Sequence, residues 1–222
     1  MNIRENIEQV LSDLPQGVRL VAVSKFHPVE ALKEAYDAGQ RIFGENKVQE
    51  MGAKQEVLPK DIEWHFIGHL QTNKIKYIVP YVSLIHGIDS YKLLNEVNKA
   101  AGQNGRVIDC LLQLHIAQEE TKFGFSFEEC RQMLTDGEWK NLTNIRICGL
   151  MGMASNTEDE EQIKREFRSL KSFFDEMAHT HFADKPEFRE LSMGMSHDYR
   201  MAVTEGSTLI RVGSKIFGER IY

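Results

Sequence analysis

The chain has 222 residues but little cysteine, no long apolar run and no excess of positive charge. Its three cysteines, Cys110, Cys130 and Cys148, are odd in number and far apart in the sequence. This pattern fits neither a disulfide framework nor a zinc knuckle with paired CxxC ligands. Because free thiols are typical of a reducing compartment, we expect a cytoplasmic protein.

No apolar run approaches the roughly 18 residues that a membrane span needs, and residues 1–15 lack the basic-then-apolar profile of a signal peptide. Lys and Arg number 27 against 33 Asp and Glu, which gives a net charge of −6. Such a balance provides no global field that attracts nucleic acid or an anionic membrane. We therefore expect a soluble protein with neither partner, and any anion site must be local.

Eight short apolar segments alternate with stretches of helical periodicity, and we predict that each is a strand. They cover residues 18–25, 41–46, 62–69, 82–89, 106–116, 144–154, 188–196 and 208–218. The clearest helix runs over 161–177, where an apolar stripe predicts core packing. The members of that stripe are Ile163, Phe167, Leu170, Phe174 and Met177. Another helix, over 3–14, precedes the first strand.

Eight strands interleaved with helices in a chain of this length predict an α/β fold, a (β/α)8 TIM barrel preceded by an N-terminal helix. We expect residues 1–222 to form one domain, with an open doubly wound sheet as the alternative. Active sites of such barrels form at the carboxyl ends of the strands. The polar residues at these ends should therefore meet at one mouth. They are Lys25, Asn46, His69, Asp89 and the segment 192–196.

Lys25 ends the first apolar segment. A lysine at a strand end is usually a solvated terminal residue. Burial there, however, lowers the pKa of an amine and leaves a neutral nucleophile that can form a Schiff base with a carbonyl compound. We therefore consider a covalent role for Lys25, provided that the rest of the mouth supplies a site for the partner.

The loops after the seventh and eighth strands are rich in small residues, namely Ser192, Gly194 and Ser196, then Gly213 and Ser214. In (β/α)8 enzymes these two loops often bind phosphate through hydroxyl and backbone N–H donors. Glycines in either segment can also serve only to permit a turn. An aldehyde that carries a phosphate and reacts with a lysine describes pyridoxal 5'-phosphate (PLP).

Arg211 lies two residues before Gly213 in the last strand, so strand alternation places both on one side and predicts that Arg211 faces the barrel mouth. A buried arginine needs a partner. An ion pair with an acidic side chain is one possibility. The other is the pyridine nitrogen of the cofactor, which a guanidinium would keep unprotonated, so that the ring becomes a poorer electron sink.

His65 and His69 stand in the polar segment WHFIGHLQTNK. They have no third ligand and no HExxH pattern, so we expect no metal site. Hydrogen bonding near the cofactor edge is one role for this segment, and capping of the next helix by Thr72 or Asn73 is another. Asn46 could orient the phenolic oxygen of the cofactor.

Seven segments together carry a family resemblance. AVSK ending at Lys25, FGEN, HFIGHLQTNK, KFGF at Lys122–Phe125, GLMGMA, LSMGMS and IRVGSKIFG resemble the YggS/PROSC family of pyridoxal phosphate homeostasis proteins. The match follows the right order over nearly the whole chain. His197 before Asp198, and Ser214 where threonine is frequent, depart from the family pattern without removing a donor.

The resemblance implies a monomeric barrel of fold type III, like the N-terminal domain of alanine racemase. It implies PLP held as a Schiff base on Lys25, its phosphate near Ser192, Gly213 and Ser214, and Arg211 by the ring nitrogen. The full set of expected cofactor contacts is Lys25, Asn46, His65, Ser192, Met193, Arg211, Gly213 and Ser214.

A racemase of this type needs two opposed acid/base groups, and Lys25 supplies only one. In the racemases that the chain resembles, the second group comes from another domain across a dimer. We therefore expect a non-catalytic protein of intracellular PLP homeostasis that buffers PLP or delivers it to PLP-dependent apoenzymes. The alternatives are a small PLP-dependent racemase or lyase, with Tyr199 or His69 as second base, and a Schiff-base aldolase without a bound chromophore.

Overall fold

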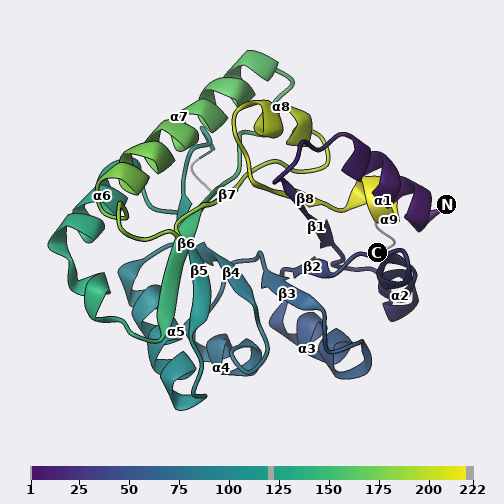
Figure 1. Ribbon diagram of the computed structural model, residues 1–222, viewed down its shortest axis with the longest axis horizontal. Coiled ribbons are helices and arrows are strands. Elements are labelled where there is room, and N and C mark those ends of the chain that lie inside the picture. The colour runs from purple at the N-terminus through teal and green to yellow at the C-terminus, as the bar shows by residue number, and fades with distance from the viewer. Residues whose placement is uncertain (1, 120–122, 219–222) are drawn as a thin grey trace.

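The computed structural model describes residues 2–119 and 123–218, and its eight strands close a parallel barrel in the order β1 to β8 (Figure 1). Each strand lies within one predicted segment, so the TIM-barrel prediction is confirmed. The strands are β1 (Arg19–Val23), β2 (Ile42–Glu45), β3 (Glu63–Phe66), β4 (Leu84–Ile88), β5 (Ile108–Leu114), β6 (Ile145–Gly152), β7 (Glu190–Ser192) and β8 (Leu209–Val212).

Helices surround the barrel (Figure 1). They are α1 (Ile3–Ser12), α2 (Val29–Asp37), α3 (Val48–Val57), α4 (Ile75–Ile78), α5 (Tyr91–Gln103), α6 (Phe127–Asp136), α7 (Glu160–His179), α8 (Tyr199–Thr204) and α9 (Ser214–Phe217). Two 3-10 turns, η1 (Thr72–Lys74) and η2 (Glu138–Asn141), complete the set. The segment 72–74 is thus a tight turn that leads into a short helix, and neither Thr72 nor Asn73 caps it through its side chain, contrary to the prediction.

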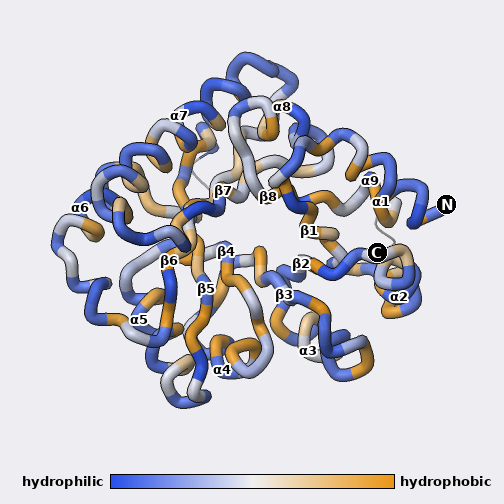
Figure 2. The backbone as a smooth tube through the Cα atoms, in the orientation of Figure 1, coloured by the Kyte–Doolittle hydropathy of each residue, from blue (hydrophilic) through white to orange (hydrophobic). Residues whose placement is uncertain are grey.

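Apolar residues form two layers. The larger one fills the space between strands and helices, and a small second cluster lies apart from it. The second cluster consists of Val21, Leu84, Leu111, Cys148, Met151 and Leu209, which come from β1, β4, β5, β6 and β8. Because parallel strands are covered on both faces, most of their side chains are buried, as all five are in β4. The exposed residues, Arg19, Glu63 and Arg146, stand at or near the starts of their strands. Figure 2 shows hydrophobic strands surrounded by helices with mixed surfaces.

The predicted stripe of α7 is buried at Ile163, Phe167, Leu170 and Met177. Phe173 takes the buried position expected for Phe174, which is only partly buried. Phe174 instead stacks on Phe188, with ring centroids 5.0 Å apart. Among the described helices, none is long and apolar enough to cross a membrane.

Helix α1 joins the two ends of the barrel. Asn6 donates through Nδ2 to the carbonyl of Ile216 in α9 at 2.9 Å, and Tyr199 of α8 donates through its hydroxyl to Asp13 at 2.5 Å. Figure 1 shows α1 beside α9. The chain therefore closes its outer layer where β1 meets β8.

Strand β1 pairs with β8 over four residues, including Val21 with Arg211 and Ala22 with Val212. Parallel strands paired in this register bring their carboxyl ends to the same rim. Lys25 and Gly213 consequently belong to neighbouring loops, although they lie near opposite ends of the sequence.

One glycine permits the β6–β7 contact. The β5–β6 ladder shifts register between Cys110 and Leu111, opposite Cys148, and Gly149 follows with a φ of 152°. A Cβ atom at Gly149 would lie 1.7 Å from the carbonyl oxygen of Glu190 in β7. No side chain fits there without separating the two strands.

We predict that Gly149→Ala lowers the free energy of unfolding by about 3 kcal/mol or more, because it combines backbone strain with a steric clash between strands. Gly105→Ala is the control, since Gly105 also has a positive φ, 62°, but has open space around its Cβ position. It should cost only about 1–2 kcal/mol. Urea unfolding of both variants measures the difference, and equal losses would contradict the steric account.

Candidate cofactor-binding site

The loops that carry the predicted site residues meet at the carboxyl end of the barrel. Lys25 lies two residues beyond β1 and is half-buried. A Cβ atom at Gly213, just after β8, would lie 2.9 Å from the carbonyl oxygen of Val23, so only glycine permits this approach. The N–H of Gly213 donates to Ser196 Oγ at 3.1 Å, which adds the loop after β7. The end of β1 that leads to Lys25, the glycine loop and the serine loop are therefore contiguous.

Ser192 is the last residue of β7, Met193 follows it, and both are fully buried. The N–H of Met193 donates to the carbonyl of Leu209 at 3.2 Å, and its carbonyl accepts from Ser207 Oγ at 2.8 Å. These bonds fix the end of β7 against β8. Ser214, in contrast, is exposed at the start of α9, which follows the β8 loop.

Arg211 is buried in β8, with 4% of its surface exposed. Its guanidinium donates to Ser192 Oγ at 2.5 Å and to the carbonyl of Gly152 at 3.2 Å. Within the described ranges no ion pair of Arg211 is found, although the charge of the Asp198 carboxylate still acts on its guanidinium. Burial lowers the pKa of Arg211 to about 10, and the group stays protonated near neutral pH with donors to spare.

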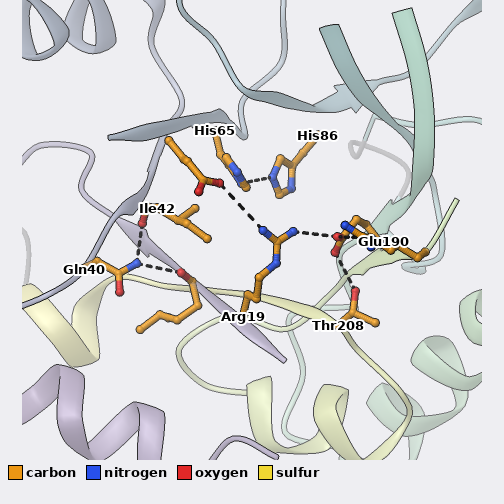
Figure 3. A network of polar contacts seen from close by, with 10 residues as sticks. Arg19, Gln40, Ile42, His65, His86, Glu190 and Thr208 are labelled. Carbon is orange, nitrogen blue, oxygen red and sulfur yellow. Dashed lines mark hydrogen bonds and ion pairs between the residues drawn. The ribbon is translucent and has the colours of Figure 1, made fainter. Parts of the chain in front are cut away.

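A buried pair of histidines continues from this arginine across the barrel. His86 of β4 places Nδ1 2.9 Å from Ser192 Oγ and Nε2 3.0 Å from Nδ1 of His65 on β3. Figure 3 shows the two imidazoles joined ring to ring. The sequence reasoning did not identify His86. Its only signal was a titratable residue inside an otherwise apolar strand segment.

The hydrogen bonds that join Arg211, Ser192, His86 and His65 depend on one another, because arginine can only donate and a neutral imidazole carries a single N–H. Ser192 Oγ must accept from Arg211. If His86 holds its proton on Nε2, it donates to His65 and Ser192 donates to His86. If the proton is on Nδ1, His86 donates to Ser192, and the hydroxyl hydrogen of Ser192 is left for an acceptor at the mouth. A phosphate oxygen is an acceptor of that kind.

His65 is buried but borders a polar pocket of about 220 Å³ at the opposite end of the barrel, where the strands begin. Arg19 lies there and pairs with Glu190 at 2.8 Å and, more loosely, with Glu63 at 4.0 Å (Figure 3). The link from His65 to the mouth runs through His86 and Ser192. Its direct contact with a cofactor stays a prediction.

Two more residues at the strand ends have polar groups suited to a ligand. Asn46, just after β2, has a buried Oδ1 without a hydrogen-bond partner among the described residues. His69 lies 3.2 Å from Asp89 and stacks on Phe123 with centroids 3.9 Å apart. Tyr199, our other candidate for a second base, instead bonds to Asp13 of the outer layer, so it does not serve the mouth.

In the described part of the chain, no three His, Cys, Asp or Glu side chains are grouped so that they could hold a metal ion. The donor set at the mouth is instead an amine, a guanidinium, hydroxyls and backbone N–H groups. These groups suit an aldehyde with a phosphate and a ring acceptor. Lys122 of the KFGF segment lies outside the described residues.

The barrel and its site define a known class. The family described as alanine racemase, N-terminal domain, matches residues 1–221, so the chain belongs to that family. Within it, the chain belongs to the YggS/PROSC group. A pyridoxal phosphate homeostasis protein of Aquifex aeolicus is 38% identical over 234 residues, which cover 100% of this chain and 100% of that protein. A pyridoxal phosphate homeostasis protein of Schizosaccharomyces pombe is 39% identical over 226 residues, which cover 98% of this chain and 90% of that protein.

Solved structures agree. PipY of Synechococcus elongatus without PLP is 40% identical, with a TM-score of 0.89 over 97% of this chain and 100% of that chain. The structure of PipY with PLP bound is 39% identical, with a TM-score of 0.86 and the same coverage. An alanine racemase of Clostridium difficile, 14% identical, shares the fold with a TM-score of 0.77 over 98% of this chain and 56% of its own.

The two buried histidines make a pH-dependent contribution to stability. Burial lowers the pKa of His65 to about 3, helped by the nearby Arg19, and lowers the pKa of His86 far below 6.5. Below pH 6.5 the unfolded chain therefore binds protons that the folded chain refuses. The stability that these neutral imidazoles provide is complete above about pH 6.5 and is lost as the pH falls toward 3.

We predict that the double variant His65→Gln and His86→Gln has a shallower loss of stability between pH 6.5 and pH 4. The slope should fall by up to about 1.4 kcal/mol per pH unit for each histidine removed. Urea unfolding at a series of pH values measures it, with His179→Gln at the exposed end of α7 as the control. Parallel pH profiles in wild type and double variant would contradict the assignment.

Proposed function

We propose that this chain binds PLP covalently on Lys25 and acts in PLP homeostasis, as a buffer or a donor of the cofactor. The observation that carries the proposal is the meeting of Lys25, Arg211 and the Gly213 loop at one mouth, a donor set that fits this ligand. Support comes from relatives over their whole length that are named pyridoxal phosphate homeostasis proteins, and from PipY, whose structure contains PLP.

Each group then has a distinct task. Lys25 would hold PLP through its amine as a Schiff base, in which a C=N bond replaces the C=O bond of the aldehyde and water is released. Ser192, Gly213 and Ser214 hold the phosphate with hydroxyl and N–H donors. Asn46 orients the phenolic oxygen of the cofactor. Met193 fixes the end of β7, which carries Ser192, against β8. When bound, PLP supplies an electron-withdrawing ring for amino-acid chemistry.

Arg211 limits that chemistry. Its guanidinium stays protonated and can only donate, so a ring nitrogen facing it must remain an unprotonated acceptor. An unprotonated ring withdraws carbanion electrons poorly. This barrel matches 56% of the chain of the racemase that shares the fold. It matches 100% of the Aquifex relative. We propose that the chain is one non-catalytic PLP-binding domain.

The setting follows from the same features. Cys110, Cys130 and Cys148 are free and buried, which supports a place in the reducing cytoplasm. We propose a monomer that passes PLP to PLP-dependent apoenzymes. A small racemase or lyase remains the second candidate because His69, paired with Asp89, stands at the mouth where a second base would be needed.

We predict that Lys25→Ala abolishes the covalent PLP adduct. Wild-type protein incubated with PLP should show a visible absorbance band, and borohydride should fix the label on the peptide that contains Lys25. Lys33→Ala, at an exposed lysine of α2, should label like wild type. If Lys25→Ala still formed a reducible adduct in the same yield as wild type, the covalent assignment would be refuted.

We also predict that the PLP-loaded protein shows no turnover in racemisation, transamination or decarboxylation of a broad amino-acid panel. Arg211→Glu, which offers the ring nitrogen a carboxylate, should alter the visible spectrum and raise transamination at least about tenfold, provided circular dichroism shows a folded variant. Robust turnover by wild type would favour the racemase or lyase. An unchanged spectrum and reactivity in Arg211→Glu would contradict the role of Arg211.

A further inference from the structure

Side chains of α3 hold the backbone on both sides of Lys25. Lys54 donates through Nζ to the carbonyl of Ser24 at 2.8 Å, and the N–H of Phe26 donates to Glu50 Oε1 at 2.6 Å. Lys54 and Glu50 are one helical turn apart and bond to each other at 2.8 Å. A single turn of α3 therefore fixes the residue before Lys25 and the residue after it.

Strand β2 supplies the third member of this clamp, which consists of Lys54, Glu50 and Glu45. Glu45 Oε1 accepts from Lys54 Nζ at 2.7 Å and from Ser24 Oγ at 2.7 Å. Ser24 is thus held by both its hydroxyl and its carbonyl. Because Glu45 directly precedes Asn46, the clamp also links the Lys25 loop to the strand end that carries another predicted cofactor contact.

The clamp holds an unfavourable backbone conformation. Phe26 has a φ of 68°, in the left-handed region, and it is the only non-glycine residue with a positive φ in the described ranges. A bulky residue stays in that region only where its surroundings enforce it, and such positions cluster at functional sites. Here the N–H of Phe26 donates to Glu50, and the N–H of His27 donates to the carbonyl of Ser24 at 3.1 Å, so both bonds hold the turn of the chain immediately after Lys25.

The charges of the clamp depend on Lys54. The side chain of Lys54 is 6% exposed and that of Glu45 is 0% exposed, and they form an ion pair at 2.7 Å. Burial raises the pKa of Glu45, and Lys54 opposes this change. Without Lys54, the two carboxylates of Glu45 and Glu50 would face each other, and the Ser24 carbonyl would lose one donor and keep the N–H of His27 at 3.1 Å.

We propose that Lys54 is a positioning residue for Lys25: through the clamp it fixes the Ser24–Phe26 turn so that the amine of Lys25 points at the aldehyde carbon. The proposal rests on the proposed function, in which Lys25 carries PLP. Lys54 does not itself contact the cofactor. Its role is to keep the amine from sampling orientations in which the C=N bond neither forms quickly nor survives hydrolysis.

The first test is Lys54→Met, which keeps an unbranched side chain but removes the charge and the hydrogen bonds. We expect borohydride to label Lys25 still, while the adduct forms more slowly and PLP is released about tenfold faster, equivalent to about 1.4 kcal/mol. Stopped-flow absorbance measures formation, and trapping of released PLP by excess apoenzyme measures release. Lys33→Met, the same change at an exposed lysine of α2, should match wild type.

A second variant separates positioning from folding. Lys54→Met combined with Glu45→Gln removes the unpaired buried charge, so it should recover stability in urea without recovering the slow release of PLP. In Glu50→Ala, which keeps Lys54, we expect faster hydrogen exchange at the Phe26 N–H together with faster release. Lys54→Arg, which retains a charged donor, should restore part of the wild-type rate.

The outcomes are distinguishable. Wild-type rates of adduct formation and PLP release in folded Lys54→Met would overturn the positioning role. Wild-type rates in the double variant alone would also overturn it, because the loss in Lys54→Met would then come only from the unpaired carboxylate of Glu45. If wild-type protein itself forms no reducible adduct on Lys25, the proposed function fails and this inference fails with it. A labelled wild type with fast release in both Lys54 variants supports the clamp.

Discussion

The pairing of β1 with β8 is the constraint on which this structure depends. It turns a row of strands into a closed barrel and brings the first and last strand ends into contact. Lys25 follows β1, Arg211 belongs to β8 and Gly213 follows β8, so closure alone brings the segment of Lys25, the cation and the glycine loop together. Helix α1 reinforces the same seam from outside by its bond to α9. The site is therefore a product of topology before it is a product of side-chain chemistry.

The barrel interior departs from the usual apolar filling. A chain of buried polar groups crosses it from Arg211 through Ser192 and His86 to His65. Each of these hydrogen bonds offsets part of the cost of burying the two polar groups that it joins. Burial lowers the pKa of both imidazoles, which keeps them neutral. The interior can thus keep the Arg211 guanidinium charged without a direct ion pair in the described ranges, supported by the charge of Asp198. A carboxylate bonded directly to the guanidinium would compete with a ligand for the same donors.

Strand periodicity was enough to predict the eight strands, the barrel and the shared rim that gathers Lys25, Ser192 and Gly213, because these follow from local pattern and one rule of parallel sheets. It could not predict partners that depend on crossing the barrel, and His86 was missed for that reason. Lys54 was missed because a charged residue on a helix normally faces solvent, whereas here tertiary packing buries it under the β1 loop. The choice between Phe173 and Phe174 likewise depended on the packing of Phe188 and not on periodicity.

Closure by the first and last strands also bears on how the protein matures. During synthesis on the ribosome, the segment with Lys25 emerges early, but Arg211 and the Gly213 loop emerge last. Under the proposed function, the nascent chain exposes the amine of Lys25 long before the loop proposed to hold the phosphate has been made. Vitamer loading would then be a late event in maturation, and a stalled translation product that ends before Arg211 would lack the groups proposed to retain the vitamer.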